Sequence, residues 1–250
     1  SGGVDSLLLA TLAHRAMPGR LVAAHAVSPA VPGECTQRVR REAASQGWRV
    51  EYLSTGEFGD ERYLENPFDR CYFCKAHLYG AMEKISWTLS GEFGFVPPAA
   101  SGANTDDLEE HRPGLDAARE FGVRHPFVEA DISKADIRAM ARELGLSFAD
   151  VPASPCLASR VYTGTRVTPE RLSAVAFAEE FLKKLLGAEV LRCRIREDAM
   201  LVEMLEAERH KATPQALQTL ARALRDNHPG IRGVELDPEC YRPGRAFVSG

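Results

Sequence analysis

The first six residues of the chain combine glycines with hydroxyl and carboxyl side chains, a pattern suited to binding phosphate. They are Ser1-Gly2-Gly3-Val4-Asp5-Ser6, and the apolar stretch 7–13 that follows favours a helix. A glycine-rich loop at a helix N-terminus offers unpaired backbone N–H groups and the positive end of the helix dipole. Asp5 adds an oxygen ligand for a Mg²⁺ ion carried by phosphates. The alternative is an ordinary glycine turn that caps a helix.

A C-x-x-C pair, Cys71 and Cys74, lies next to two basic residues. Arg70 and Lys75 flank the pair, and positive charge together with a helix start favours the thiolate form that binds metals. Outside a disulfide-rich secreted chain, a C-x-x-C indicates metal or redox chemistry. The alternative is a pair of buried small apolar side chains.

A third cysteine, Cys156, lies in a proline-rich stretch without periodicity, four residues before Arg160. Together with the C-x-x-C pair it gives three thiolates, the ligand set of a [4Fe–4S] cluster with one iron left open. A structural zinc ion would need a fourth ligand, for which His77 is the nearest candidate. The other three cysteines are expected to be structural: Cys35, Cys193 and Cys240.

The composition limits the class of protein. The chain has 250 residues, of which 44% are hydrophobic and 26% charged, enough for one large core or two modest ones. Its net charge of −4 argues against nucleic acid as a partner. No run of about 18 apolar residues could span a membrane, and the polar start shows no signal peptide. We therefore expect a cytoplasmic protein without a disulfide scaffold.

The order of the expected elements predicts an α/β fold with a doubly wound parallel sheet, whose ligands bind at the carboxyl ends of the strands. Helices are expected over 7–16, 36–46, 75–89, 113–121 and 133–144, with Thr36 and Ser133 as N-caps. Strands are expected over 21–27, 48–53 and 126–128, and a strand over 96–101 would be interrupted by two prolines. A nucleotide-binding loop of this kind follows a buried strand, so we also expect a strand before Ser1 that this sequence does not include.

The periodic pattern stops between 148 and 166 and then resumes in a different form. A long helix beginning at Thr168-Pro169, strands over 190–195 and 200–204, a helix over 214–227 and a strand over 233–236 predict a smaller α+β domain. We therefore expect an α/β nucleotide-binding domain over 1–150, a cysteine-bearing linker over 151–166, and an α+β domain for substrate or oligomerisation over 167–250.

The opening loop resembles the SGGxDS loop of the PP-loop ATP pyrophosphatases, which have the adenine nucleotide alpha hydrolase-like fold. With four further segments, the chain is similar to LarE, a family of ATP-dependent sacrificial sulfur transferases. These segments are Asn66 to Lys75, Ser101 to Asp107, His111 to Leu115, and Pro152 to Arg160.

The resemblance implies a two-stage reaction on a small-molecule nucleotide. ATP adenylylates a carboxylate of pyridinium-3,5-biscarboxylic acid mononucleotide, and sulfur then displaces AMP to leave a thiocarboxylate, on the way to the nickel-pincer cofactor of lactate racemase. In one branch the cysteine matching Cys156 gives up its sulfur and becomes dehydroalanine. In another, three cysteines hold a [4Fe–4S] cluster with an extra sulfide. The presence of Cys71 and Cys74 favours the cluster branch, and the family implies a homo-oligomer.

The resemblance also implies roles on the substrate side. Arg192 and Arg194 would hold the substrate phosphate as guanidinium forks, and their i, i+2 spacing places them on one face of a strand. Two solvated strand residues are the alternative. Glu180 falls near an acid of the family. Arg160 would favour the ionised thiol of Cys156.

On the nucleotide side, Ser1, Gly2, Gly3 and Ser6 would bind the phosphates of ATP. Asp5 would bind Mg²⁺ directly or through water, assisted by Asp106 or Asp107, for which a solvated turn is the alternative. Asn104 would shape the loop beside ATP. The apolar strand position of His25 favours a core histidine or a neighbour of adenine.

Three other functions share parts of this pattern. A tRNA thiolase can use the same loop and three cysteines, but it needs a basic surface. An ammonia-using amide ligase of the NAD synthetase type would leave the three cysteines without a role. A non-catalytic, metal-dependent scaffold would release no pyrophosphate.

Overall fold

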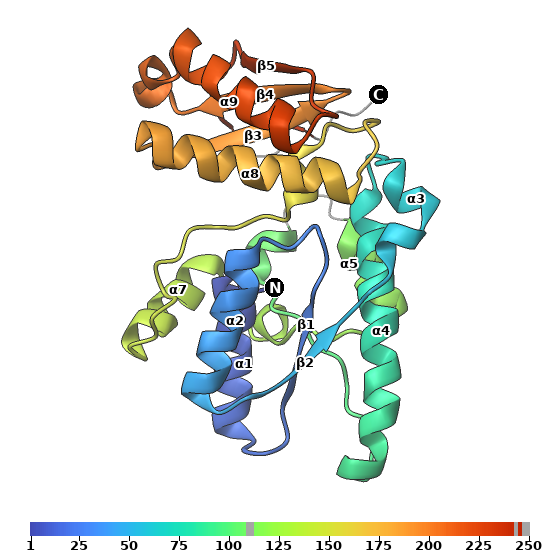
Figure 1. The fold of residues 1–250 in the computed structure, drawn as a ribbon. Coiled ribbons are helices and arrows are strands. Elements are labelled where there is room, and N and C mark those ends of the chain that lie inside the picture. Colours follow the sequence, from blue (N-terminus) through green and yellow to red (C-terminus); the bar gives the residue numbers. More distant parts are fainter. Residues whose placement is uncertain (109–112, 243–244, 247–250) are drawn as a thin grey trace. The chain divides into compact units, whose positions relative to one another are not determined.

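The computed structural model describes residues 1–108, 113–242 and 245–246. By their contacts the residues fall into two units (Figure 1). Unit 1 comprises Ser1–Glu57 and Asp69–Ser154, and unit 2 comprises Phe58–Phe68 and the chain from Pro155 onward. His111 and Arg112, which belong to one of the segments that carry the resemblance, lie outside the described residues. Across the part of the chain that is described, no helix has the length and apolar character needed to cross a membrane.

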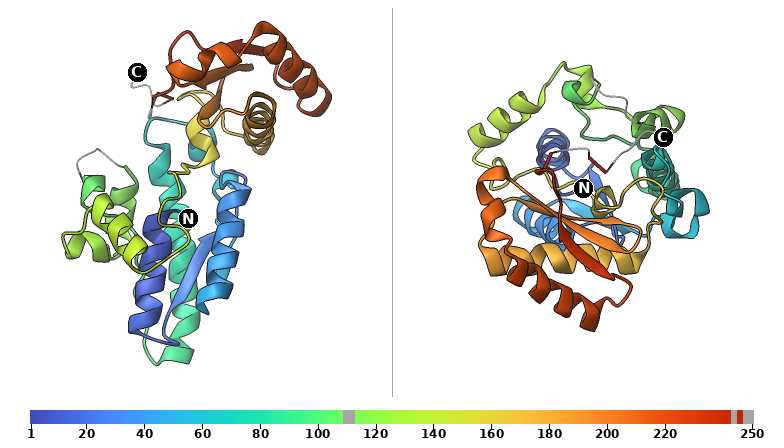
Figure 2. Two further views of the ribbon diagram at one scale, coloured as in Figure 1. Left: turned by 90° about the vertical axis from the view of Figure 1, so that its left-hand side faces the viewer. Right: turned by 90° about the horizontal axis from the view of Figure 1, so that it is seen from above.

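Unit 1 contains a parallel pair of strands with helices around it. Strand β1 (Val22–Ala26) pairs with β2 (Arg49–Leu53) in parallel. In Figure 1, α1 and α2 lie on one side of these strands and α4 on the other, and Figure 2 shows unit 1 from a second side. The helices are α1 (Val4–Ala16), α2 (Gly33–Gln46), α4 (Arg70–Phe93), α5 (Pro113–Glu120), α6 (Pro126–Glu129) and α7 (Lys134–Glu143), with a 3₁₀ turn η2 (Thr105–Leu108).

The core of unit 1 fixes the start of α1. Val4, Leu7 and Leu8 are buried there, together with Ile137 of α7 and Phe148. Apolar burial of this kind contributes roughly 1.5–3 kcal/mol per large side chain. Because the first turn of α1 packs in the core, the end of the glycine-rich loop that leads into this helix is fixed in position.

The α/β character and the parallel pairing of the strands over 21–27 and 48–53 are confirmed. The extended doubly wound sheet is not: the described residues of unit 1 form a two-stranded sheet and one parallel bridge, Ala100 with Arg124. The predicted interruption by Pro97 and Pro98 fits this single bridge, because proline lacks the N–H that a ladder needs.

In unit 1, one predicted element type and one predicted helix start near the parallel strands are wrong. Residues 126–128 form the short helix α6 instead of a strand, because Pro126 occupies the first helical position, which favours a helix start. Helix α2 begins at Gly33 instead of Thr36, whose hydroxyl instead lies 2.9 Å from Nε2 of His25. The capping box of Ser133 with Asp136 on α7 is confirmed.

Unit 2 is a three-stranded sheet covered by two helices. Its strands β3 (Leu191–Arg196), β4 (Ala199–Met204) and β5 (Gly233–Leu236) lie in the order β3-β4-β5, the first pair antiparallel and the second parallel. Helix α8 (Pro169–Leu186) contacts β3, α9 (Pro214–Asn227) contacts β5, and the two helices contact each other. The predicted start of α8 at Thr168-Pro169 is confirmed. The 3₁₀ turns are η3 (Leu157–Arg160) and η4 (Glu206–Lys211).

Segment Phe58–Phe68, which contains the short helix α3 (Glu61–Leu64), groups with unit 2 although its neighbours in sequence belong to unit 1. The 3₁₀ turn η1 (Glu57–Gly59) marks the crossing. Asn66 connects this segment to residues 162–165 of unit 2. Its buried Nδ2 donates to the carbonyl oxygens of Tyr162 and Thr165, both at 2.8 Å. The carbonyl of Asn66 accepts a bond of 2.9 Å from the N–H of Gly164.

Replacing Asn66 with alanine should lower the free energy of unfolding by about 2–4 kcal/mol, because the buried side-chain hydrogen bonds to the carbonyls of Tyr162 and Thr165 are lost and the residue has a φ of 57° that alanine disfavours. Urea unfolding followed by circular dichroism measures the change. Asn227→Ala, at an exposed position of α9, is the matched control and should stay within about 0.5 kcal/mol of the parent. Equal stability of the two variants would contradict this role of Asn66.

Candidate functional site

The glycine-rich loop at the start of α1 is built for close approach. Gly2 has a φ of +77°, and a Cβ there would lie 2.6 Å from the carbonyl oxygen of Cys35, so only glycine fits. Nη1 of Arg38 donates to the carbonyl oxygen of Gly2 at 2.6 Å. Gly3 occupies the N-cap position and brings no capping side chain. The first N–H groups of α1 are therefore open to an anion.

The two serines of the loop face each other. Their hydroxyl oxygens, on Ser1 and Ser6, lie 2.9 Å apart. The hydroxyl of Ser6 also donates to the carbonyl of Gly3 at 3.1 Å. The loop is thus closed by its own hydroxyls, which are the side chains that the sequence assigns to phosphate binding.

A second segment of unit 1 lies against this loop. A Cβ on Gly102 would lie 2.8 Å from the backbone of Asp5, so the glycine permits the close approach. Nδ2 of Asn104 lies 3.5 Å from Oδ1 of Asp5. Lys134 joins the group from α7: its ammonium contacts Oδ2 of Asp5, and its backbone N–H donates to Oδ1 of Asp106 at 3.0 Å. The structure therefore brings together three residues that the sequence predicts for this site, Asp5, Asn104 and Asp106, and one that it does not, Lys134.

Carboxylate oxygens such as those of Asp5 and Asp106 are the donors that Mg²⁺ prefers. The amide of Asn104 lies beside them, 2% exposed, and its Oδ1 has no hydrogen-bond partner among the described residues. A buried acceptor without a donor is rare in folded proteins. The donor set fits a metal-nucleotide complex, and the role of each residue stays a prediction.

His25 lies at the buried strand position where the sequence places it. Its Nε2 is 2.9 Å from the hydroxyl of Thr36, and Nδ1 has no partner among the described residues. Burial, with the nearby charge of Arg40, lowers the pKa of His25 to about 4. The ring is therefore neutral near pH 7, with one nitrogen a hydrogen-bond donor and the other an acceptor.

The C-x-x-C pair lies at the beginning of α4, which starts at Arg70 instead of the predicted Lys75. Cys71 and Cys74 are therefore both helical, and their i, i+3 spacing places them on one face. Both are partly exposed. In the described ranges, no three side chains among histidines, cysteines, aspartates and glutamates gather into a metal-binding group. The three-thiolate site thus stays a prediction.

In unit 2, Cys156 is an exposed residue at the N-cap of η3. Its carbonyl oxygen accepts bonds from the N–H of Ser159 at 3.0 Å and the hydroxyl of Ser159 at 2.7 Å. Nη1 of Arg160 donates to the same carbonyl at 3.2 Å. The backbone of the turn is therefore fixed while the thiol faces solvent.

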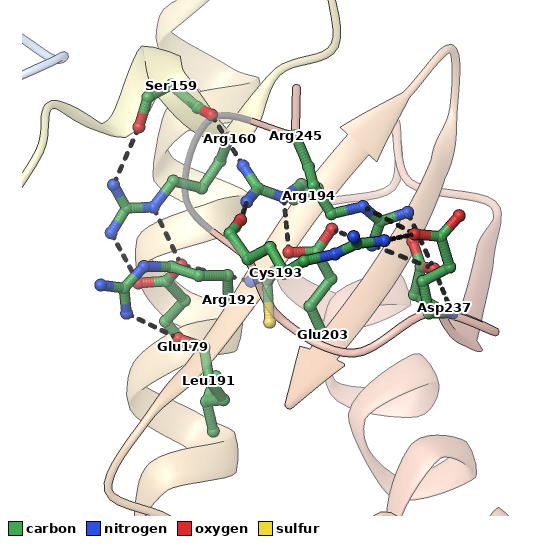
Figure 3. A network of polar contacts seen from close by, with 12 residues as sticks. Ser159, Arg160, Glu179, Leu191, Arg192, Cys193, Arg194, Glu203, Asp237 and Arg245 are labelled. Atoms are coloured by element: carbon green, nitrogen blue, oxygen red, sulfur yellow. Dashed lines mark hydrogen bonds and ion pairs between the residues drawn. The ribbon is translucent and has the colours of Figure 1, made fainter. Parts of the chain in front are cut away.

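Arg160 is buried and holds this turn from the inside (Figure 3). Its Nε donates to Oε1 of Glu179 at 3.1 Å, and Nη1 donates to the carbonyl of Pro155 at 2.8 Å. The same Oε1 accepts the backbone N–H of Cys193 at 3.2 Å. These contacts make Arg160 a positioning residue for the Cys156 turn.

Arg194 reaches the same turn from β3. It is 4% exposed, and its Nη1 donates to the carbonyl of Ser159 at 3.0 Å. Its Nε lies 2.7 Å from Oε2 of Glu203 in an ion pair. Burial raises the pKa of Glu203, and the guanidinium of Arg194 opposes that shift. Arg245 pairs with the other oxygen of Glu203 at 2.7 Å, and Figure 3 shows the connected network.

Arg192 is the more accessible of the two predicted phosphate-binding arginines. It is partly exposed, its Nη1 donates to the carbonyl of Leu191 at 2.8 Å, and its guanidinium lies 5.2 Å from the centre of the Tyr241 ring. The spacing of Arg192 and Arg194 on β3 matches the predicted shared face, but the structure gives them different surroundings.

The acid of α8 that joins this network is Glu179, one residue from the predicted Glu180. Glu180 is exposed and pairs with Lys184 at 2.6 Å. Glu179 lies on the buried face of the helix with Val175 and Leu182. Glu179 lies four residues after Val175 and three before Leu182, which places it on the apolar face of the helix. This spacing is the sequence signal that distinguishes it from Glu180.

The pair of glutamates gives a matched test. Glu179→Gln should lower the free energy of unfolding by about 3 kcal/mol, because it leaves the buried guanidinium of Arg160 without its counter-charge. Glu180→Gln should change it by less than about 0.5 kcal/mol, since that ion pair is exposed. Urea unfolding measures both, and the reverse order would show that Glu180 is the structural acid.

No family model matches the chain. The chain is 35% identical over 245 residues to "Uncharacterized protein slr1717" of Synechocystis sp., covering 98% of this chain and 89% of that protein. It is 28% identical over 182 residues to "Uncharacterized protein MJ0830" of Methanocaldococcus jannaschii, covering 73% and 68%.

A third relative has a named activity. The chain is 30% identical over 253 residues to the pyridinium-3,5-bisthiocarboxylic acid mononucleotide synthase of Lactiplantibacillus plantarum, covering 98% of this chain and 86% of that enzyme. The match covers 98% of the chain and therefore extends over both units. The chain therefore belongs to the LarE family, the family of this synthase.

Proposed function

We propose that the chain is an ATP-dependent sulfur transferase of nickel-pincer cofactor synthesis. Its substrate is pyridinium-3,5-biscarboxylic acid mononucleotide, whose carboxylates it adenylylates and converts to thiocarboxylates. Family membership supports the substrate class. The observation that carries the proposal is the exposed Cys156 on a turn whose backbone two buried guanidiniums hold in place.

Adenylylation is needed because a carboxylate repels a thiolate and has no good leaving group. A carboxylate oxygen of the substrate attacks the α-phosphorus of ATP, and the bond from that phosphorus to the bridging oxygen breaks to release pyrophosphate. The N–H groups at the start of α1 would stabilise the phosphates. Asp5 and Asp106 would hold the Mg²⁺ that accompanies ATP, which offsets their charge.

Sulfur transfer then follows at the activated carbon. The thiolate of Cys156 attacks the acyl carbon, and AMP leaves with the electron pair of the broken C–O bond. A base removes the Cα proton of Cys156, the Cβ–S bond breaks, and the sulfur leaves on the substrate as a thiocarboxylate. Cys156 becomes dehydroalanine, so each chain supplies one sulfur by this route.

The substrate phosphate would bind to Arg192. Its guanidinium is partly exposed, whereas that of Arg194 is buried against Glu203 and Ser159. A planar guanidinium suits bidentate binding of phosphate. We assign Arg194 the supporting task of holding the Cys156 turn.

A [4Fe–4S] cluster would give the second source of sulfur. It would use Cys71, Cys74 and Cys156, and would supply a sulfide in place of the cysteine's own sulfur. Two of these thiols share one face of α4 in unit 1, and the third, Cys156, belongs to unit 2. A cluster would show itself by iron and sulfide in anaerobically reconstituted protein.

Intact-mass spectrometry tests the proposal. After incubation with ATP, Mg²⁺ and the pyridinium dicarboxylate nucleotide, the wild-type chain should lose the mass of one H₂S, and Cys156→Ser should lose nothing and form no thiocarboxylate. Cys240→Ser, which removes another surface thiol, should behave as the wild type. If the wild-type chain forms product, keeps its mass and contains bound iron, the cluster and not Cys156 supplies the sulfur. Thiocarboxylate formed by Cys156→Ser would overturn the proposal.

A further inference from the structure

Lys134 occupies a position in unit 1 that the reaction above does not use. Its ammonium contacts Oδ2 of Asp5, the carboxylate proposed to bind Mg²⁺. Its backbone N–H donates to Oδ1 of Asp106 at 3.0 Å. One residue therefore contacts both carboxylates of the proposed metal-nucleotide site.

The backbone of Lys134 is held firmly. The residue is the first of α7, behind the N-cap Ser133 and its reciprocal bonds with Asp136. Ile137, in the next turn, is fully buried in the core of unit 1. The flexible four-carbon stem of the lysine thus starts from a fixed point, and its ammonium can move over a short arc without disturbing the helix.

A second observation points to a ligand at this place. Asn104 is 2% exposed, its Nδ2 lies 3.5 Å from Oδ1 of Asp5, and its Oδ1 has no partner within the described part of the chain. A buried amide oxygen of this kind calls for a donor. Mg²⁺ retains several of its waters in proteins, and such a water is a donor of suitable chemistry.

Lysine and metal compete for Asp5. Mg²⁺ binds carboxylate oxygen at about 2.0–2.1 Å, so a cation at Oδ2 displaces the ammonium that contacts it. The ammonium then needs another anion, and the phosphates that arrive with the metal supply one. Lysine is a frequent phosphate ligand as a mobile point charge.

We propose that Lys134 neutralises Asp5 in the nucleotide-free protein and moves to the phosphates of ATP when Mg²⁺ and ATP bind together. The lysine is then both a phosphate ligand and a block on divalent-cation binding in the absence of nucleotide. The inference rests on the proposed function only in requiring ATP as the substrate. Lys134 would also stabilise the charge of the departing pyrophosphate.

The test is a pair of binding measurements on the full chain. Mn²⁺ alone is titrated by electron paramagnetic resonance, and Mg²⁺ with ATP by calorimetry. Lys134→Gln should bind Mn²⁺ about tenfold more tightly, because the competing ammonium is gone. It should bind Mg²⁺ with ATP about ten- to a hundredfold more weakly, the usual effect of losing a charged hydrogen bond.

The controls separate charge from structure. Lys84→Gln makes the same change of net charge at an exposed position of α4 and should leave both affinities unchanged. Lys134→Arg keeps the charge and should stay within a few-fold of the wild type, which provides a folded variant if glutamine destabilises α7. Asp5→Asn removes the ligand of the metal and should lose Mn²⁺ binding.

The opposite shifts of the two affinities are the decisive result. If both affinities of Lys134→Gln fall together, the lysine is structural, and if neither changes, it does not contact metal or phosphate; either result overturns the proposal. A wild-type chain that binds no Mg²⁺ with ATP would instead refute the proposed function, and this inference with it. The two failures are therefore distinguishable.

Discussion

Two buried guanidiniums fix the turn that carries Cys156, and the other buried charges nearby neutralise them. Arg160 pairs with Glu179 and Arg194 pairs with Glu203, and both arginines donate to carbonyl oxygens of the turn. Isolated buried charges are very costly, whereas paired and hydrogen-bonded ones are tolerated. The arrangement makes a short irregular segment rigid while its thiol stays exposed, which is what a nucleophile on a loop requires.

The glycine-rich loop of unit 1 also depends on close backbone approach. Gly2 packs against Cys35 and Gly102 against Asp5 at distances that a Cβ would not permit. These contacts bring the glycine-rich loop, the segment after Ser101 and the start of α7 together within unit 1. There the carboxylate of Asp5 contacts the ammonium of Lys134 and lies 3.5 Å from the amide nitrogen of Asn104, and Asp106 accepts the backbone N–H of Lys134.

Local sequence patterns predict much of the secondary structure, and the features that they do not predict depend on contacts between residues far apart in the sequence. The capping box at Ser133 and the helix start at Thr168 depend on a few neighbouring residues, so the sequence was sufficient. The contact of Asn66 with Thr165 joins residues 99 positions apart in sequence. A local pattern of apolar residues cannot predict such a contact, so it does not show that segment 58–68 packs with unit 2. The extended sheet is predicted from the alternation of expected strands and helices, and one of those expected strands, 126–128, is a helix because proline begins it.

The candidate site residues also divide into those that a local motif predicts and those that depend on long-range contacts. Cys156 and Asp5 are predicted as site residues from residue type within a recognisable motif, and both stay predictions. Glu179, which joins the buried network, is not among the predicted residues, although the apolar spacing on α8 indicates that it faces inward and that Glu180 is exposed. Lys134 was missed because its partner, Asp5, is 129 positions away in sequence.

The most direct test of the account follows the sulfur atom itself. The chain is produced with isotopically labelled cysteine, freed of loosely bound sulfide, and incubated with ATP, Mg²⁺ and the pyridinium dicarboxylate nucleotide, and the thiocarboxylate product is analysed by mass spectrometry. The account predicts label in the product, in an amount limited to one sulfur per chain. Unlabelled thiocarboxylate, formed in the absence of added sulfide, would contradict it.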